Sequence, residues 1–383
     1  MSSRVLVVTN DLPPRPGGIQ SYLAGMLAHL PAGGPVAEVT VYGSSWRGAA
    51  EHDAALPHRV VRDPAGVLLP TPRVLRATAA LAREVRADTV WFAAAAPLGL
   101  LAPGLRRRTG ITRAVASTHG HEVGWARLPG ARRLLRAVGD GLDAVTYLGA
   151  YTRERLAPAL GPHPELVRLP GGVDTEVFGP DGDARAATRR RLGLDAGTPV
   201  VLCVSRLVAR KGQESLVRAL PALRRRVPGT TLLLVGGGPD RDRLHALAAG
   251  LGVGSSVRIT GSVPWGELPA YYTAGDVFAM PCRTRRAGTD VEGLGIVYLE
   301  ASATGLPVVA GDSGGAPDAV REAETGWVVA GGDQDALERR VGDLLADPHG
   351  ARRMGAAGRR WVQADWRWQD RAAQLADVLA GPG

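Results

Sequence analysis

Lys211 is the one lysine among 46 basic side chains, so the other 45 (46 − 1) are arginines. An ammonium is a compact point charge on a flexible stem, and it fits where several phosphate oxygens converge, whereas a guanidinium is a broad planar fork. Arg206 and Lys211 both follow the same strand-like run, so both can reach a ligand beyond the end of that strand. The alternative is a lysine that survives by chance on a helix face.

Two carboxylates, Glu292 and Glu300, flank a glycine-rich segment. The segment consists of Gly293, Leu294, Gly295 and Ile296, and it leads into a helix predicted to begin near Gly295. Each carboxylate can bind a vicinal diol, one on a sugar and one on a ribose, while amides at a helix start favour a diphosphate. A solvated glutamate on a helix face is the simpler interpretation of Glu300, but the loop position makes it a poor one for Glu292.

Polar residues also follow strand-like runs in the first half of the chain. Gly17 and Gly18 open a predicted helix, where backbone amides approach an anion, although a Gly-Gly turn is more often only a turn. His119 lies in Ser117-Thr118-His119-Gly120-His121-Glu122. Two imidazoles and one carboxylate suggest a metal, but no partner cluster is visible, so we predict none. Residues 236–238 are three glycines without the G-x-G-x-x-G spacing, and they indicate a structural turn.

Apolar runs alternate with helical stretches along the whole chain. The first set of runs covers residues 5–9, 39–42, 89–92, 114–117, 144–147 and 166–169, and the second covers 200–205, 232–235, 257–260, 277–280, 308–310 and 327–329. Their continuous apolar character is typical of parallel strands that are covered on both faces. We therefore predict an α/β protein of two Rossmann-like, doubly wound domains, each with six strands. Ligands are expected at the carboxyl ends of the strands, in a cleft that the two domains face.

The predicted domains cover residues 1–172 and 185–365, and a C-terminal helix, 366–383, completes the first. Residues 179–183 are rich in turn formers and suit a hinge. Cys203 and Cys282 lie far apart in apolar runs, which favours buried thiols in a reducing cytoplasm. No apolar stretch is long enough to span a bilayer and the N-terminus enters a strand directly, so we expect neither a signal peptide nor a transmembrane helix.

The net charge of +9 and the pI near 10.3 favour an anionic partner. Aromatic residues make up only 5% of the chain and no nucleic-acid-binding motif is present, so we predict no nucleic acid. Arginines gather in the first half at Arg73, Arg76, Arg83 and Arg86, at residues 106–108, and at Arg132, Arg133 and Arg136. With neighbouring leucines they predict a surface for anionic lipid, and solvated arginines on ordinary helices are the alternative.

Four separated motifs agree with one known family. The Arg-x4-Lys pair, the Glu-x7-Glu element, the N-terminal Gly-Gly loop and the Thr-His after the fourth strand resemble the retaining glycosyltransferases of family 4, which have the GT-B fold. The resemblance covers essentially the whole chain, in order. Residues 282–301, with Ser313-Gly314-Gly315-Ala316-Pro317, are most similar to actinobacterial GDP-mannose-dependent phosphatidyl-myo-inositol (mono)mannoside α-mannosyltransferases, especially those that add the second mannose.

The resemblance implies transfer of mannose from GDP-mannose, as co-substrate and without a cofactor, to a phosphatidylinositol mannoside or related glycolipid. It also implies a cytoplasmic protein that associates peripherally and transiently with the anionic inner face of the membrane. Arg206 and Lys211 would stabilise the leaving diphosphate. Other implied roles are phosphate contact by Gly17 and Gly18, ribose binding by Glu300, sugar binding by Glu292 and the 293–296 amides, a sugar contact by His119, a donor contact by Val263, and acceptor contacts by Asp11 and Gln20.

Three other interpretations remain open. The chain could be a family 4 transferase that uses another nucleotide sugar and a soluble acceptor. It could be a GT-B sugar-nucleotide epimerase, although the Arg/Lys and Glu-x7-Glu set argues against this. It could also be a non-catalytic basic protein that binds anions or lipid. Release of a nucleoside diphosphate that depends on an acceptor would separate these possibilities.

Overall fold

The computed structural model describes residues 2–31 and 34–382 and divides into two compact units. The first runs from the N-terminus to Gly172 and resumes at Trp368, and the second is Val173–Arg367. The segment 179–183, expected to be a hinge, lies inside the second unit. There the side chain of Asp181 accepts a hydrogen bond from Ala184 N and caps helix α8 (Gly182–Arg191).

In the described part of the first unit, seven parallel strands form one sheet in the order β3-β2-β1-β4-β5-β6-β7. The strands are β1 (Ser3–Thr9), β2 (Val36–Ser44), β3 (Arg59–Asp63), β4 (Thr89–Phe92), β5 (Arg113–Ser117), β6 (Ala144–Tyr147) and β7 (Glu165–Arg168). The prediction of six strands was wrong because it missed β3. This edge strand is only partly buried and carries charged residues, so it lacks the continuous apolar run of a central strand.

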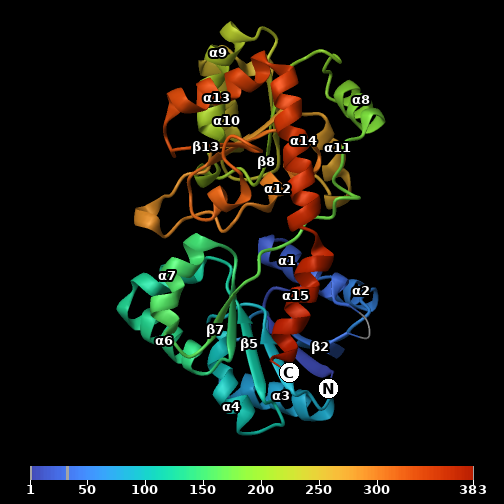
Figure 1. Ribbon diagram of the computed structural model, residues 1–383, viewed down its shortest axis with the longest axis vertical. Helices are drawn as coiled ribbons and strands as arrows, with labels where there is room; N and C mark the ends of the chain where they lie inside the picture. The colour runs from blue at the N-terminus through green and yellow to red at the C-terminus, as the bar shows by residue number, and fades with distance from the viewer. Residues whose placement is uncertain (1, 32–33, 383) are drawn as a thin grey trace. The chain divides into compact units, whose positions relative to one another are not determined.

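Helices cover this sheet. They are α1 (Gly18–His29), α2 (Ala49–Ala54), α3 (Pro72–Glu84), α4 (Ala102–Arg106), α5 (Glu122–Arg127), α6 (Pro129–Asp140), α7 (Ala150–Leu160) and α15 (Trp368–Ala380), with the 3-10 helix η1 (Leu98–Leu101). Helix α15 packs against α1 (Figure 1). It also contacts β1, β2, β4 and β5. It begins at Trp368 rather than at residue 366, because the preceding helix ends at Asp365.

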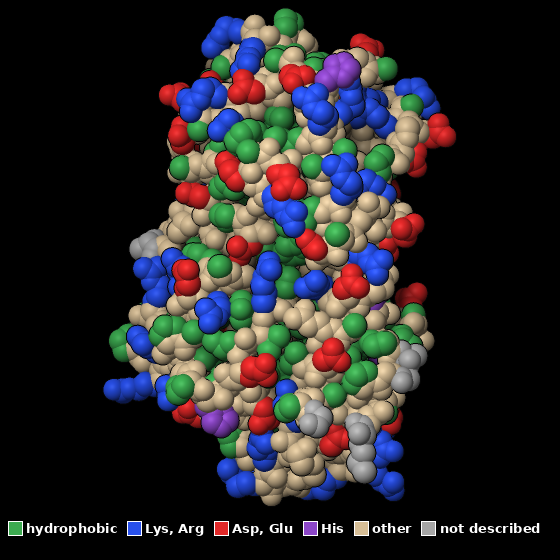
Figure 2. Space-filling model, in the orientation of Figure 1, with side chains coloured by type: hydrophobic (Ala, Val, Ile, Leu, Met, Phe, Trp, Pro, Cys, Tyr) green, Lys and Arg blue, Asp and Glu red, His purple; other side chains and the backbone are tan. Residues whose placement is uncertain are grey.

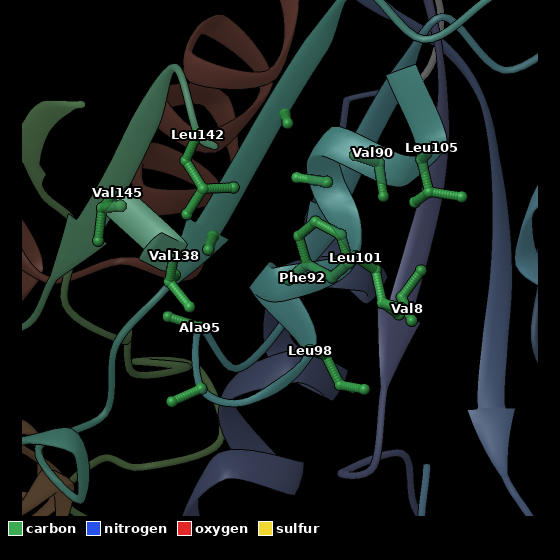
Figure 3. Close-up of a cluster of buried hydrophobic side chains, with 14 of the residues drawn as sticks. Val8, Val90, Phe92, Ala95, Leu98, Leu101, Leu105, Val138, Leu142 and Val145 are labelled. Atoms are coloured by element: carbon green, nitrogen blue, oxygen red, sulfur yellow. The ribbon is translucent and has the colours of Figure 1, made fainter. Parts of the chain in front are cut away.

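The main core of the first unit lies between its strands and helices η1, α4 and α6. Figure 3 shows Phe92 of β4 surrounded by leucine and valine side chains from these elements. The labelled residues are Val8, Val90, Phe92, Ala95, Leu98, Leu101, Leu105, Val138, Leu142 and Val145. All of them are buried, so the strands are fixed from this side by close apolar packing.

The second unit repeats the design with six parallel strands among its described residues, in the order β10-β9-β8-β11-β12-β13. The strands are β8 (Val200–Val204), β9 (Thr231–Val235), β10 (Val257–Ile259), β11 (Val277–Met280), β12 (Val308–Gly311) and β13 (Gly326–Val329). This number agrees with the predicted one. Each unit has the Rossmann strand order, in which the chain reverses direction across the sheet after its first three strands.

The helices of the second unit are α8, α9 (Gln213–Arg226), α10 (Arg241–Gly250), α11 (Leu268–Thr273), α12 (Ile296–Ala303), α13 (Gln334–Ala346) and α14 (Pro348–Asp365). Short 3-10 helices are η2 (Ala209–Lys211), η3 (Gly254–Ser256), η4 (Trp265–Glu267), η5 (Arg286–Gly288) and η6 (Ala316–Ala319). Helix α9 packs on α10 and α13, while α12 packs on α14 (Figure 1). Because α12 and α13 both contact β11 and β12, the central strands are covered by helices.

Close backbone approach gives a test of the packing in the first unit. A Cβ at Gly139 of α6 would lie 2.1 Å from the carbonyl oxygen of Leu160, whereas a Cβ at Gly130 of the same helix meets nothing within 4 Å. We expect Gly139→Ala to destabilise the unit by about 1–3 kcal/mol or more through overpacking, and so to lower its thermal midpoint by several degrees. Calorimetry of both variants measures this. Equal midpoints for Gly139→Ala and Gly130→Ala would contradict the packing.

Candidate functional site

The strongest constellation of polar groups lies in the second unit, where two adjacent strands end. Strands β8 and β11 are neighbours in the sheet, and the strand order reverses between them. In open α/β sheets ligands bind outside the carboxyl ends of the strands at this reversal. Arg206 and Lys211 follow β8, and the segment that contains Glu292 follows β11. The structure therefore places the predicted donor residues on two elements that meet at the expected position.

The loop after β8 is held in a conformation that only glycine can complete. Gly212 has a φ of +78°, and a Cβ there would lie 2.1 Å from the carbonyl oxygen of Pro281. The buried Gln213 side chain donates hydrogen bonds to Ser205 Oγ (2.8 Å) and to the carbonyl oxygen of Arg206 (3.0 Å). These contacts fix the main chain on both sides of η2, which carries Lys211.

Glu292 is the centre of a buried cluster of charges. Its Oε2 atom lies 2.7 Å from Lys211 Nζ and 2.5 Å from Arg210 Nη1, and Arg210 Nε lies 3.0 Å from Asp290 Oδ1. Burial alone would raise the pKa of Glu292, but the charges of Lys211 and Arg210 outweigh it and hold that pKa below its ordinary value. Glu292 is thus a carboxylate at neutral pH, and Lys211 is oriented by it.

Arg210 is a member of this cluster that the sequence did not single out. It shares Glu292 Oε2 with Lys211 and is itself paired with Asp290. In a chain with 45 arginines the residue type carries no signal, and its position next to Lys211 is the only hint. Arg206, in contrast, is exposed, and its guanidinium makes no ion pair within residues 2–31 and 34–382. Its charge is therefore available to an anion.

The Glu292 loop rests on the segment that follows β12. Ser313 Oγ accepts a hydrogen bond from Glu292 N (3.2 Å), and Gly315 N donates to the carbonyl oxygen of Glu292 (3.0 Å). Gly314 has a φ of +59°, and a Cβ there would lie 1.9 Å from the same carbonyl oxygen. The Ser-Gly-Gly run therefore fixes the main chain that carries the carboxylate.

Glu300 lies on α12, which begins directly after Gly295. The helix starts at Ile296 with Gly295 as its cap, close to the predicted start, and Gly293 and Leu294 lie in the loop before it. Tyr272 Oη donates a hydrogen bond to Glu300 Oε2 (2.6 Å), and no hydrogen bond or ion pair joins Glu300 to Lys211 in the described chain. Val263, another predicted donor contact, is half-buried in the loop between β10 and η4.

In the first unit, the acceptor candidates are joined by a direct contact. Gln20 Nε2 donates a hydrogen bond to Asp11 Oδ1 (2.7 Å), and Asp11 N donates one to Thr9 Oγ1 (2.8 Å). Gly17 directly precedes α1, and a Cβ on Gly17 would lie 2.1 Å from Gln20 Oε1. Gly18 is the first residue of the helix, and a Cβ on it would meet nothing within 4 Å. Asp11, Gln20 and Gly17 therefore form one group beyond the end of β1.

His119 follows β5, and its ring contacts Ala93, the residue after the neighbouring strand β4. Its Nε2 atom lies 2.6 Å from the carbonyl oxygen of Ala93, and the edge of the ring meets Tyr22 with centroids 4.9 Å apart. Burial lowers the pKa of His119 below its ordinary value, although Glu122 acts in the opposite direction. The imidazole is neutral at pH 7. Among the described residues no group of three or more His, Cys, Asp or Glu side chains is arranged to hold a metal.

Comparison with known proteins matches both units. The family model "Glycosyltransferase Family 4" covers residues 16–177, and "Glycosyl transferases group 1" covers residues 184–361. The GDP-mannose-dependent alpha-(1-6)-phosphatidylinositol monomannoside mannosyltransferase of Mycolicibacterium smegmatis is 56% identical over 98% of each chain. The GDP-mannose-dependent monoacylated alpha-(1-6)-phosphatidylinositol monomannoside mannosyltransferase of Corynebacterium glutamicum is 46% identical, over 99% of this chain and 98% of the relative.

Solved structures share the fold along the whole chain. Sucrose-phosphate synthase of Thermosynechococcus elongatus superposes with a TM-score of 0.79 at 25% identity, and the alignment covers 97% of each chain. Anabaena HepE, solved with UDP, has a TM-score of 0.79 at 19% identity over 99% of each chain. The two parallel sheets are thus those of GT-B proteins.

Glu300 predicts a pH dependence of stability. Burial raises its pKa to about 7, from an ordinary value of 4.5. The folded state therefore holds this proton more tightly than the unfolded state. The stability that this gives is complete below about pH 4.5 and is lost as the pH rises through about 7. We expect the thermal midpoint of the second unit to fall over this window, and Glu300→Gln to flatten the fall. The exposed Glu324→Gln is the control, and identical pH profiles for Glu300→Gln and wild type would contradict the assignment.

Proposed function

The chain belongs to the family 4 glycosyltransferases, and within them to the GDP-mannose-dependent phosphatidylinositol monomannoside mannosyltransferases, and we propose that it transfers mannose from GDP-mannose to a phosphatidylinositol mannoside. The observation that carries the donor half is the Lys211–Glu292–Arg210 cluster at the reversal of the second sheet. The full-length identity to the mycobacterial and corynebacterial enzymes supports the choice of mannose and of the acceptor.

The chemistry that this cluster supports is stabilisation of a leaving diphosphate. The ammonium of Lys211 has three N–H donors. One of them points to Glu292, and the other two can donate to phosphate oxygens. Arg206 adds an exposed cation, and the amides at the start of α12 add partial positive charge. Such fixed cations matter most when negative charge develops as the bond to the sugar breaks. Glu300 accepts hydrogen bonds and suits a ribose diol, and the remaining Glu292 oxygen suits a sugar hydroxyl.

The first unit supplies backbone amides, a neutral imidazole and the hydrogen-bonded side chains of Asp11 and Gln20. In the proposal, the amides of Gly17 and Gly18 bind phosphate oxygens, and His119 binds a sugar hydroxyl. Asp11 and Gln20 bind the acceptor, since their mutual hydrogen bond fixes both side chains for hydroxyl groups. Reaction with retention of configuration needs no carboxylate nucleophile when the leaving phosphate itself takes the acceptor's proton.

We also propose that the protein binds anionic membrane through the corner between α5 and α6. Leu128 and Leu134 are 62% and 45% exposed, and Arg132 and Arg133 beside them are exposed. Such a surface combines apolar insertion with attraction to anionic headgroups. None of the helices in the described residues has the length and the apolar character to cross a bilayer.

The charge elsewhere is less suited to this role. Arg73 on α3 donates two hydrogen bonds to Asp63, and Arg136 on α6 is paired with Asp140. On the face shown in Figure 2, blue Lys and Arg side chains lie among red Asp and Glu side chains rather than in one basic field. A local cluster at Arg132 and Arg133 is therefore the better candidate.

The decisive experiment is acceptor-dependent release of GDP. The purified chain is incubated with GDP-mannose and vesicles that contain phosphatidylinositol monomannoside, with UDP- and ADP-sugars as competing donors. We expect GDP release that requires the acceptor and a product with one more mannose. Preference for another nucleotide sugar, or transfer to a soluble acceptor only, would reject the proposal while keeping the family.

The lysine is the first test of mechanism. Lys211→Ala should lower kcat by about 100-fold or more, since a fixed cation at the leaving group is lost. Lys211→Arg should also be impaired, because Arg210 already occupies one side of Glu292 and a planar fork does not replace a point charge. The exposed Arg218→Lys swap on α9 is the control, with activity near wild type. Normal kcat in Lys211→Arg would refute the role of the ammonium.

Liposome binding tests the membrane proposal. We expect binding to need anionic lipid and to weaken above physiological salt, where the screening length falls below about 8 Å. Arg132→Glu with Arg133→Glu should abolish vesicle binding and lipid-acceptor activity but leave GDP affinity unchanged. The matched control reverses Arg352 and Arg353, two exposed arginines of α14 in the other unit. Equal effects of both double variants would show only a general response to net charge.

A further inference from the structure

Glu122, which the sequence offered only as a possible metal ligand, has a different arrangement. It begins α5 and its side chain is fully buried. Its Oε2 atom accepts hydrogen bonds from His119 N (3.0 Å) and Gly120 N (3.1 Å). The turn between them needs Gly120, whose φ is +94°. One carboxylate oxygen therefore closes the turn that carries His119.

A buried carboxylate is an unusual acceptor for two backbone amides, because its burial is unfavourable. Burying a carboxylate costs much more than burying a neutral group, and water or a hydroxyl could accept the same hydrogen bonds. The second oxygen, Oε1, is buried and accepts no hydrogen bond in the part of the chain that the structure describes. His121 Nε2 lies 3.4 Å from this oxygen. The side chain is thus held by its contacts to the His119 turn.

The ring of His119 makes its own contacts, in addition to those of its main chain. A carbonyl oxygen only accepts, so the 2.6 Å contact with Ala93 O requires the proton on Nε2. In the neutral ring Nδ1 is then an acceptor, and no described residue donates to it. Burial, which lowers the pKa of His119, favours this neutral form. Tyr22 packs against the ring from α1.

We propose that Glu122 is a positioning residue, which locks the His119 turn so that the ring stays on Ala93 O and presents Nδ1 as the acceptor for a hydroxyl of the donor sugar. The sugar contact rests on the proposed function. The lock itself does not, because it consists of contacts within the first unit. Displacement of a substrate-contacting group by about 1 Å can cost 100-fold in rate, so a turn of this kind needs a strong lock.

Three variants separate positioning from mere stabilisation. Glu122→Ala removes the acceptor, and Glu122→Gln keeps one oxygen that can accept from both amides. Asp143→Ala is the matched control. Its carboxylate also accepts a main-chain hydrogen bond, from Ala114 N (2.7 Å), and pairs with Arg106. Asp143 precedes β6, however, whereas His119 follows the neighbouring parallel strand β5. The two residues therefore lie at opposite ends of these strands.

The first measurement is nitrogen NMR of the full chain with labelled histidine. The chain has eight histidines, so the His119 signals can be assigned by comparison with His119→Gln. We expect a single Nε2–H tautomer in wild type, Glu122→Gln and Asp143→Ala, and a mixture of tautomers in Glu122→Ala. A wild-type pattern in folded Glu122→Ala would overturn the proposal. If Glu122→Ala does not fold, loss of the single tautomer or of activity in Glu122→Gln would overturn it instead.

The second measurement is transfer from GDP-mannose. Glu122→Ala should lower kcat by about 10- to 100-fold with GDP affinity unchanged, because the cations proposed to bind the diphosphate, Arg206 and Lys211, are in the other unit. Glu122→Gln should stay within about threefold of wild type, as should Asp143→Ala despite its lower thermal midpoint. An equal kcat loss in Asp143→Ala would indicate general destabilisation and reject positioning. If the wild-type chain transfers no mannose, the proposed function fails, while the NMR comparison still decides the lock.

Discussion

Two cations meet one carboxylate oxygen at the end of the second sheet, with Lys211 Nζ 2.7 Å and Arg210 Nη1 2.5 Å from Glu292 Oε2. Charges this close and this buried are stable only as a set, because loss of one partner leaves another unpaired away from water. The main chain on both sides must therefore be fixed. Gly212 and Gly314 allow this, since a Cβ at either would strike a backbone carbonyl oxygen. The backbone geometry of the loops thus follows from the cluster that they carry.

The same cluster explains how the site holds two neighbouring cations, since two carboxylates offset their mutual repulsion. Arg210 and Lys211 are balanced by Asp290 and Glu292, so the formal charge of the four groups is zero. Attraction for an anion must then come from the exposed Arg206 and from the helix start. A ligand phosphate would share Lys211 with Glu292 rather than replace Glu292, because an ammonium has donors for both. Cations that are held by such contacts have fixed positions, which is what electrostatic catalysis requires.

The parts that could be predicted from sequence are those that depend on local pattern. Central parallel strands are continuous apolar runs, so the sequence predicts that the residues that follow them, Lys211 and Glu292 included, lie beyond the carboxyl ends of the strands. That the strands before these two residues are neighbours is seen only in the structure. The edge strand β3 was missed because its exposed side chains break the run. Arg210 was missed because its role depends on partners about 80 residues away. The sequence placed Glu122 only near a possible metal site that we did not predict, and its contacts with two amides could not be seen without the structure.

The two units have the same strand order and use it for different physical tasks. Beyond the second sheet, charged groups prevail, and a leaving diphosphate gains negative charge as its bond breaks. Beyond the first sheet, the groups are held by hydrogen bonds: Gln20 on Asp11, His119 on Ala93 O, and the His119 turn on Glu122. Sugar hydroxyls carry no net charge, so hydrogen bonds recognise them, and a fixed acceptor such as a neutral imidazole selects the direction of the O–H. The distribution of charge between the units therefore follows the charge of what each is proposed to bind.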